Sequence, residues 1–337
     1  MRENKGRWSV TFTGVALLLT TLILSTVTTT SPAEAQQDSS YRYAAGSRTT
    51  ARWADAIDTR SQSAVNAAYW AQYAPKQLLS IDWLLGSLLG CHAGITSGST
   101  NAATLSSLNF VRSLAGLGPV SFSPALNSSA QQAALIMAAN GSLSHYPSSS
   151  WRCWSSTGAR AASRSNLALA YPSLRAGQII DLYMDDPGSD NVAAGHRRWI
   201  LNPFSTVMGS GSTATANALT VVGPTSAARP NPRWVGWPSA GYFPNAIEPR
   251  GRWSLSSGLS SVSFTRARIA VYRGTVRIPV HKYPVHNGYA QPTMVWQMPP
   301  NLDENATYRV VVTGIRKAGL ARALRMAYTV RLFTPSH

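Results

Sequence analysis

Charged residues are scarce in this sequence. Asp, Glu, Lys and Arg together make up 13% of the 337 residues, and only 13 residues are acidic. A polar but weakly charged chain fits an extracellular product better than a cytosolic one. Zinc-finger, helix-turn-helix and ribonucleoprotein signatures are absent, and the arginines form no clustered basic run. We therefore expect no specific nucleic-acid partner.

Long apolar runs are missing, apart from one near the start. Three basic residues within the first seven positions precede the apolar stretch 15–24, and Ala33-Glu34-Ala35 follows it. This order predicts a signal peptide over residues 1–35 that is cleaved after Ala35. The stretch is short for a membrane span, although an uncleaved anchor is the alternative. We expect a secreted protein, extracellular or in the cell envelope, without a transmembrane span after signal cleavage.

Cysteine is nearly absent as well. Cys91 and Cys153 are the only two. In an oxidising compartment an even pair predicts one disulfide bond, with two buried free thiols as the alternative. Such a bond would stabilise the fold by roughly 3–4 kcal/mol in the chain-entropy description of a loop of this length.

Positive charge, by contrast, is abundant. The formal net charge is +17 and the isoelectric point is about 10.5, mostly because of arginine. A positive field of this size attracts anionic partners, such as phospholipid or anionic wall polymers. We expect the partners to include an anionic envelope surface, a lipid or a protein ligand.

The chain length predicts two domains after the signal peptide. Residues 36–97 read as a polar and helical lead-in, with its helices interrupted at Pro75. Residues 98–224 carry helical patterns over about 103–115 and 124–140, and a third pattern ends at Asp185. A cluster of prolines then marks a boundary. Residues 225–337 consist of short strand-like runs between turns, which predicts a small all-β sandwich-like domain.

The third helical pattern ends in two adjacent carboxylates, Asp185 and Asp186. Negative charges at a helix C-terminus oppose the helix dipole, so we expect a positively charged partner for them. His196 and Arg197 follow only one loop later.

A nine-residue motif, Gly195-His196-Arg197-Arg198-Trp199-Ile200-Leu201-Asn202-Pro203, stands near the middle of the chain. The proline biases the residue before it away from helix, so the motif reads as one short helical turn. Taken alone, it describes a surface turn that places its apolar residues in the core and leaves its arginines in solvent.

Four motifs in order resemble the CAP superfamily, which includes cysteine-rich secretory proteins, antigen 5 and plant pathogenesis-related proteins. The resemblance covers roughly residues 98–223 and is nearest to bacterial secreted members, because a multi-disulfide pattern is absent. The motifs are Asn109-Phe110-Val111-Arg112 with Ala115-Gly116-Leu117, Leu143-Ser144-His145, Ser165-Asn166-Leu167-Ala168, and Gly195 to Leu201.

The resemblance implies an α+β fold, with an α-β-α sandwich and a shallow cleft that carries two histidines and two acids. His145 and His196 match the histidines, Asp185 matches one acid, and Ser165 stands where the other acid is usual. The expected metal ligands, for Zn²⁺ or another divalent cation, are His145, Asp185 and His196. The residues expected to line the cleft are His145, Ser165, Asn166, Asp185, His196 and Arg197.

Three functions follow from these observations. We expect a non-enzymatic binding protein for a lipid, envelope or protein ligand. A metal-dependent or acid-base hydrolase that uses His145 and His196, with Asp185 as a further catalytic candidate, is the first alternative. A structural or adhesive envelope component is the second. The chain has no Gly-x-Ser-x-Gly nucleophile motif.

Overall fold

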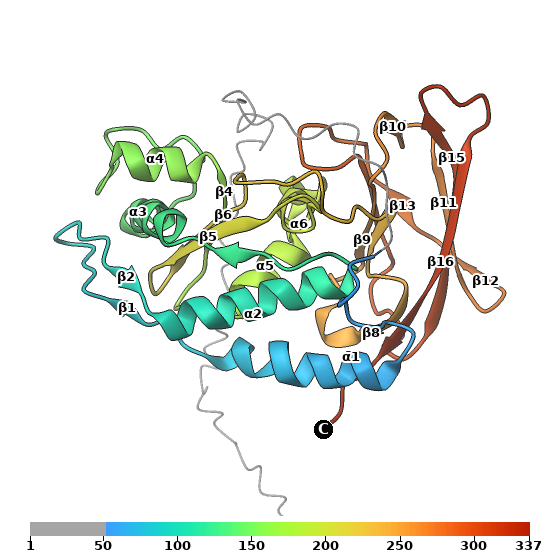
Figure 1. Cartoon of the computed structure of the whole chain (residues 1–337), viewed down its shortest axis with the longest axis horizontal. Helices are drawn as coiled ribbons and strands as arrows, with labels where there is room; N and C mark the ends of the chain where they lie inside the picture. The colour runs from blue at the N-terminus through green and yellow to red at the C-terminus, as the bar shows by residue number, and fades with distance from the viewer. Residues whose placement is uncertain (1–51) are drawn as a thin grey trace, which may run out of the picture.

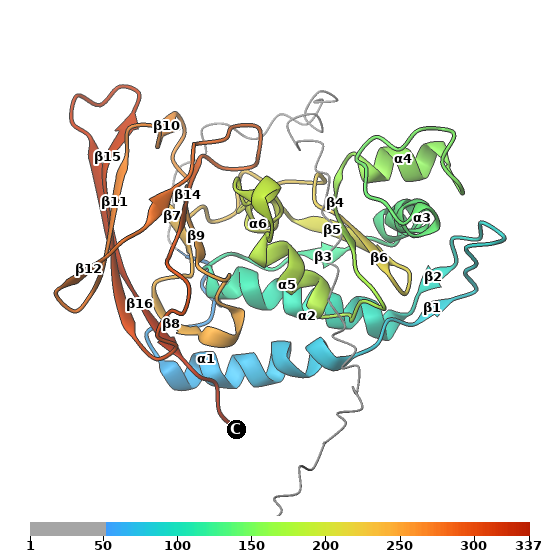
Figure 2. The same ribbon diagram turned by 180° about the vertical axis from the view of Figure 1, so that it is seen from behind.

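The computed structural model describes residues 52–337 (Figures 1 and 2). The predicted signal peptide and the first part of the predicted lead-in lie outside the described residues. Within residues 52–337, no helix combines the length and the apolar character needed to cross a membrane. The predicted mixed class, helices with sheets, is confirmed at this level.

The lead-in is helical only in its first half. Helix α1 (Gln62–Ala68) begins at Ser61, whose hydroxyl accepts a hydrogen bond from the Ala64 amide, and it continues as a π-helical and a 3-10 turn to Leu78. Pro75 lies in the first turn of that 3-10 segment, at the predicted break. Strand β1 (Trp83–Leu84) then pairs with β2 (Ile95–Thr96), so the helical prediction for this part is wrong.

The middle of the chain forms a four-stranded sheet in the order β3-β5-β6-β4. Only β3 and β5 are parallel neighbours. Each face of the sheet packs against a separate hydrophobic cluster. The adjacent residues Ala218 and Leu219 of β6 point to opposite faces, and each belongs to a different cluster. The strands are β3 (Ser121–Phe122), β4 (Ser165–Leu169), β5 (Val207–Ser212) and β6 (Ala216–Thr220).

Helices cover both faces of this sheet. Helix α3 packs on β5 and β6 together with α4, while α2 and α5 lie on the other side (Figure 1). The contact with α3 is close, because a Cβ atom added to Gly211 would lie 2.1 Å from the Gln131 amide. The helices are α2 (Gly98–Leu114), α3 (Pro124–Asn140), α4 (Ser156–Ala162), α5 (Gln178–Asp185) and α6 (Gly195–Ile200).

The C-terminal segment contains a six-stranded and a four-stranded sheet. The six-stranded sheet runs β12-β11-β15-β16-β8 with β10 beside β15, and the other runs β13-β14-β9-β7. Trp253 of β9 meets Tyr308 of β15 edge to face at 5.7 Å between ring centroids, so the sheets contact each other. The strands are β7 (Trp234–Trp237), β8 (Gly241–Pro244), β9 (Arg252–Ser257), β10 (Val262–Ser263), β11 (Arg268–Arg273), β12 (Val276–Ile278), β13 (His281–Lys282), β14 (Thr293–Gln297), β15 (Thr307–Lys317) and β16 (Leu324–Phe333).

The two halves share packing across the predicted boundary near residue 225. One hydrophobic cluster contains Trp199 and Ile200 of α6 and also Val235 and Trp253 of the C-terminal strands. The fully buried tryptophans of these strands, at 237, 253 and 296, fill the core and expose no ring for a ligand. The division into domains at residues 224 and 225 stays a prediction.

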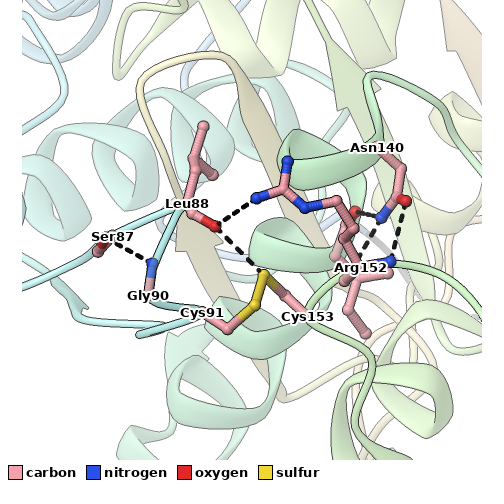
Figure 3. The surroundings of a disulfide bond; sticks show 8 residues. Ser87, Leu88, Gly90, Cys91, Asn140, Arg152 and Cys153 are labelled. Atoms are coloured by element: carbon pink, nitrogen blue, oxygen red, sulfur yellow. Dashed lines mark hydrogen bonds between the residues drawn. A yellow bond between two sulfur atoms is a disulfide. The ribbon is translucent and has the colours of Figure 1, made fainter.

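The predicted disulfide bond is confirmed. Cys91 and Cys153 are bonded at 2.12 Å and join the β1–β2 segment to the loop between α3 and α4. Asn140 at the end of α3 holds Arg152 by accepting a hydrogen bond from its amide and donating one to its carbonyl, at 3.1 and 3.0 Å (Figure 3). The bond therefore fastens the loop that also contains His145.

Candidate functional site

His196 is held by the end of the preceding helix. Gly195 before it packs against Tyr289, where a Cβ atom would lie 2.3 Å from the ring. The His196 Nδ1 atom lies 2.5 Å from Asp186 Oδ1, and the imidazole stacks on Tyr183 at 5.5 Å between centroids. An ionised carboxylate only accepts hydrogen bonds, so Nδ1 carries a proton, and in the neutral ring Nε2 is the acceptor.

His145 is oriented in the same manner by a different group. Its Nδ1 atom lies 2.9 Å from the carbonyl oxygen of Ala162 at the end of α4. A carbonyl also only accepts, so the proton again stays on Nδ1. Burial lowers the pKa of His145, and the nearby His196 lowers it further, while the Ala162 carbonyl opposes the shift. His145 is therefore neutral near pH 7, with Nε2 as an acceptor.

Both histidines line one small pocket together with Ser165 and Asn166. The Ser165 hydroxyl is engaged elsewhere, since it donates to the Ala161 carbonyl at 2.7 Å and lies 3.0 Å from the Thr220 hydroxyl. The pocket offers imidazole nitrogens, but no hydroxyl hydrogen-bonded to a histidine. Its other lining residues are Ser163, Arg164, Trp199, Val221 and Val222.

The acidic partner of the site is Asp186, and the expectation that Asp185 joins the histidines is wrong. Asp186 is fully buried and accepts hydrogen bonds from His196 and from the Arg197 amide at 3.0 Å. Asp185 instead pairs with Arg250 at 3.2 Å. Asp186 ends α5 in the left-handed conformation, with φ of 48°, so the two adjacent carboxylates leave the helix in different directions.

The donor set does not fit a resident catalytic zinc ion. A catalytic zinc usually has three protein ligands. Among residues 52–337, no three His, Cys, Asp or Glu side chains are grouped so that they could hold a metal ion. The predicted triad of His145, Asp185 and His196 therefore does not form, and two imidazoles are left.

Comparison with known families decides what the middle segment is. Residues 105–222 match the family model CAP, the cysteine-rich secretory protein family. These residues form a CAP domain. The match covers about a third of the chain and includes every pocket residue named above. No curated protein matches the chain.

The arginines of the Gly195–Leu201 motif tie the CAP domain to the C-terminal segment, and the expectation that they stay in solvent is wrong. Arg197 is fully buried and donates to the carbonyls of Met184 and Arg252, at 2.6 and 2.7 Å. Burial lowers its pKa to about 10, so it stays charged near pH 7. Arg197 is thus absent from the pocket lining where it was expected.

Two further arginines of the motifs also donate to backbone carbonyls, one of them across to the C-terminal segment. Arg198 donates to the His286 and Gln291 carbonyls of the C-terminal segment, at 3.0 and 2.8 Å. Arg112, from the first CAP motif, donates to the Ile200 and Asn202 carbonyls at 2.6 and 2.9 Å and so fixes the end of α6. The motifs that carried the resemblance are therefore in contact with one another.

Asp185 makes stability depend on pH. Burial raises its pKa to about 6 against the opposing effects of Arg250 and Arg197. Because the folded pKa lies above the unfolded one, this contribution is fully present below about pH 4 and is lost as the pH rises through 6. We expect Asp185→Asn to remove it, so that the variant gains about 2 kcal/mol relative to wild type between pH 4 and 7.5. Urea unfolding at both pH values measures this, and equal differences at the two would contradict it.

Proposed function

We propose that the chain is a secreted binding protein of the bacterial CAP type that lacks enzymatic activity. In this proposal the signal peptide over residues 1–35 directs export, and the CAP domain adopts an α-β-α sandwich. Its ligand is a lipid, an envelope component or a protein group that enters the cleft beside His145 and His196. The family description, which names secretory proteins, and the disulfide bond support export.

One observation carries the proposal. Each imidazole uses its Nδ1–H on the protein, which leaves the Nε2 atoms of His145 and His196 as acceptors in a pocket whose other walls include Trp199, Val221 and Val222. A ligand group with hydroxyl or amine donors on an otherwise apolar skeleton fits this pocket, because its donors can bind the Nε2 acceptors and its apolar part can contact the apolar walls. Two fixed hydrogen-bond acceptors beside apolar walls therefore favour ligand binding over catalysis.

The hydrolase alternative lacks its chemical groups. Hydrolysis needs an activated nucleophile, or a metal-bound water with a base. The Ser165 hydroxyl donates to a backbone carbonyl, and no three-ligand metal group exists in residues 52–337. Asp186 orients His196, as the acid of a catalytic triad would, but among the lining residues no hydroxyl or thiol is hydrogen-bonded to that imidazole.

The proposal is tested by what remains bound to the mature secreted protein. Native mass spectrometry followed by extraction is run on wild type, His145→Ala, His196→Ala and the control His281→Ala, whose histidine is exposed on β13. We expect a bound species in wild type and control, and roughly tenfold less in each cleft variant, because each loses one hydrogen-bond acceptor.

Two results would contradict the proposal. Equal amounts of bound species in the cleft variants and the control would place the ligand elsewhere. Turnover of an ester or peptide substrate by wild type, lost in both cleft variants but kept in the control, would establish the hydrolase instead.

A further inference from the structure

The outer face of the six-stranded sheet is strongly basic. Strands β8, β11, β12, β15 and β16 contain no Asp or Glu. Figures 1 and 2 place β11, β15 and β16 at the end of the molecule opposite α3 and α4. No residue of these strands lines the histidine pocket. Seven arginines of the six-stranded sheet are exposed. Arg273 and Arg316 have hydrogen-bond partners within the chain, and we call the other five the sheet arginines: Arg268, Arg277, Arg309, Arg325 and Arg331.

Strand pairing brings the sheet arginines onto one face. Tyr272 of β11 pairs with Arg277 on one side and with Arg309 on the other, and Arg331 pairs with Thr307. Side chains alternate between the faces of a strand, and neighbouring strands lie about 4.8 Å apart. The residues between them, such as Val310 and Val330, are buried on the inner face. The outward positions therefore form a compact array of positive charge.

These guanidiniums lack partners within the described part of the chain. Within residues 52–337, no side chain of the sheet arginines forms a salt bridge or a hydrogen bond. Arg309 stacks over Tyr272 at 4.6 Å and Arg331 over Tyr242 at 5.2 Å. Stacking holds a guanidinium flat and leaves its N–H edges available for a ligand. The nearby acid Asp303 already pairs with Arg273 at 3.3 Å.

The shape of the face favours an extended ligand. Ala270, Val311 and Ala327 pair across three strands and form a row of small side chains. Rows with arginines lie on both sides of it, with Arg268 on one side and Arg309 on the other. No large apolar side chain stands out from these positions, whereas insertion into a membrane interface needs such groups. A linear chain can lie along the row between the two lines of charge.

We propose that this face binds a linear, phosphate-bearing polymer other than a nucleic acid. Unpaired like charges on one sheet face oppose folding, so the array has no explanation in stability. Arginine binds phosphate oxygens through two parallel N–H groups, and several arginines at regular spacing match a repeating anion. The site is separate from the histidine pocket and does not depend on the function proposed for it.

The test measures binding of long-chain inorganic polyphosphate to the mature protein by calorimetry at several salt concentrations. The first variant combines Arg309→Gln, Arg325→Gln and Arg331→Gln, and a second combines Arg268→Gln with Arg277→Gln. The control removes three exposed arginines outside the six-stranded sheet, Arg152→Gln, Arg160→Gln and Arg175→Gln, which lie in the loop before α4, in α4 and in the segment before α5.

We expect the triple variant to bind at least about tenfold more weakly than the control, because charge-assisted contacts to phosphate are lost. The slope of log affinity against log salt concentration should be smaller in magnitude by about two for the triple variant than for wild type. The double variant should lose affinity in the same direction. The His145→Ala variant should bind polyphosphate as tightly as wild type does. This result distinguishes a failure of the present proposal from a failure of the ligand-binding function proposed for the histidine pocket.

Three outcomes would overturn the proposal. Equal losses in the triple variant and the control would mean that net charge alone attracts the polymer. Binding to phosphatidylglycerol vesicles without binding to polyphosphate would make the face a membrane contact. A single-stranded DNA oligonucleotide bound more tightly than polyphosphate of equal charge would make it a nucleic-acid surface.

Discussion

Replacing Asp186 by Asn is expected to lower the free energy of unfolding by about 3–5 kcal/mol, the loss typical of one buried partner of an ion pair. The carboxylate accepts from His196 Nδ1 and from the Arg197 amide, and an amide group cannot accept from both. The buried guanidinium of Arg197 also loses a neighbouring negative charge. Asparagine tolerates the left-handed backbone found there, so the change isolates the charge.

The adjacent carboxylate supplies the control. Asp185 pairs with Arg250, whose side chain is 74% exposed, and such pairs contribute about 0–1 kcal/mol. Urea unfolding at pH 7 should therefore show a large loss for Asp186→Asn and no loss for Asp185→Asn. If the order were reversed, the assignment of Asp186 to the histidine would be wrong.

Removing the disulfide bond should have the second largest effect. We expect Cys91→Ser combined with Cys153→Ser to lower the free energy of unfolding by roughly 3–4 kcal/mol, because the unfolded chain regains the freedom of a loop with a sequence separation of 62. The loop that contains His145 should also become more accessible, since the bond fastens its far end.

Urea unfolding of the double serine variant, compared with wild type in the presence and absence of reductant, measures this loss. Reduced wild type should match the variant, which controls for the two substitutions themselves. A variant as stable as oxidised wild type would contradict the role given to the bond.

Local signals in the sequence predicted the central helices well. The Ser123-Pro124 pair and Gly141 mark the ends of α3, because proline suits the first helical turn and Gly141 adopts the left-handed conformation with φ of 57°. Helix α5 starts later than its apolar pattern suggests, at Gln178 and not near Ser173. The positions of His145 and His196 beside one pocket also agree with the motifs that carried the resemblance.

The site partners could not be predicted in the same way. Which of two adjacent aspartates faces the histidine depends on a single left-handed residue at the end of α5. The burial of Arg197 depends on carbonyls of β9, 55 positions further along the chain. Neither leaves a periodic pattern. Each carboxylate nevertheless has a partner, since Asp186 is hydrogen-bonded to His196 and Asp185 pairs with the positively charged Arg250.

The sheet arginines show a related limit. They are spread over residues 268–331, so the sequence shows no basic run, and the clustering arises only from strand alternation and pairing. Strand β16 holds two arginines, Arg325 and Arg331, which stand six positions apart and therefore fall on the same face of the strand.

The central claim is that His145 and His196 each bind the protein through Nδ1–H and so leave Nε2 for a ligand in one pocket. Long-range ¹H–¹⁵N NMR correlations of the six histidines test it directly, with His145→Ala and His196→Ala for assignment. At pH 7.5 both rings should carry a proton on Nδ1, and His145 should be neutral because burial lowers its pKa. A ring of either histidine without a proton on Nδ1, or a His145 that is charged at pH 7.5, would contradict the account.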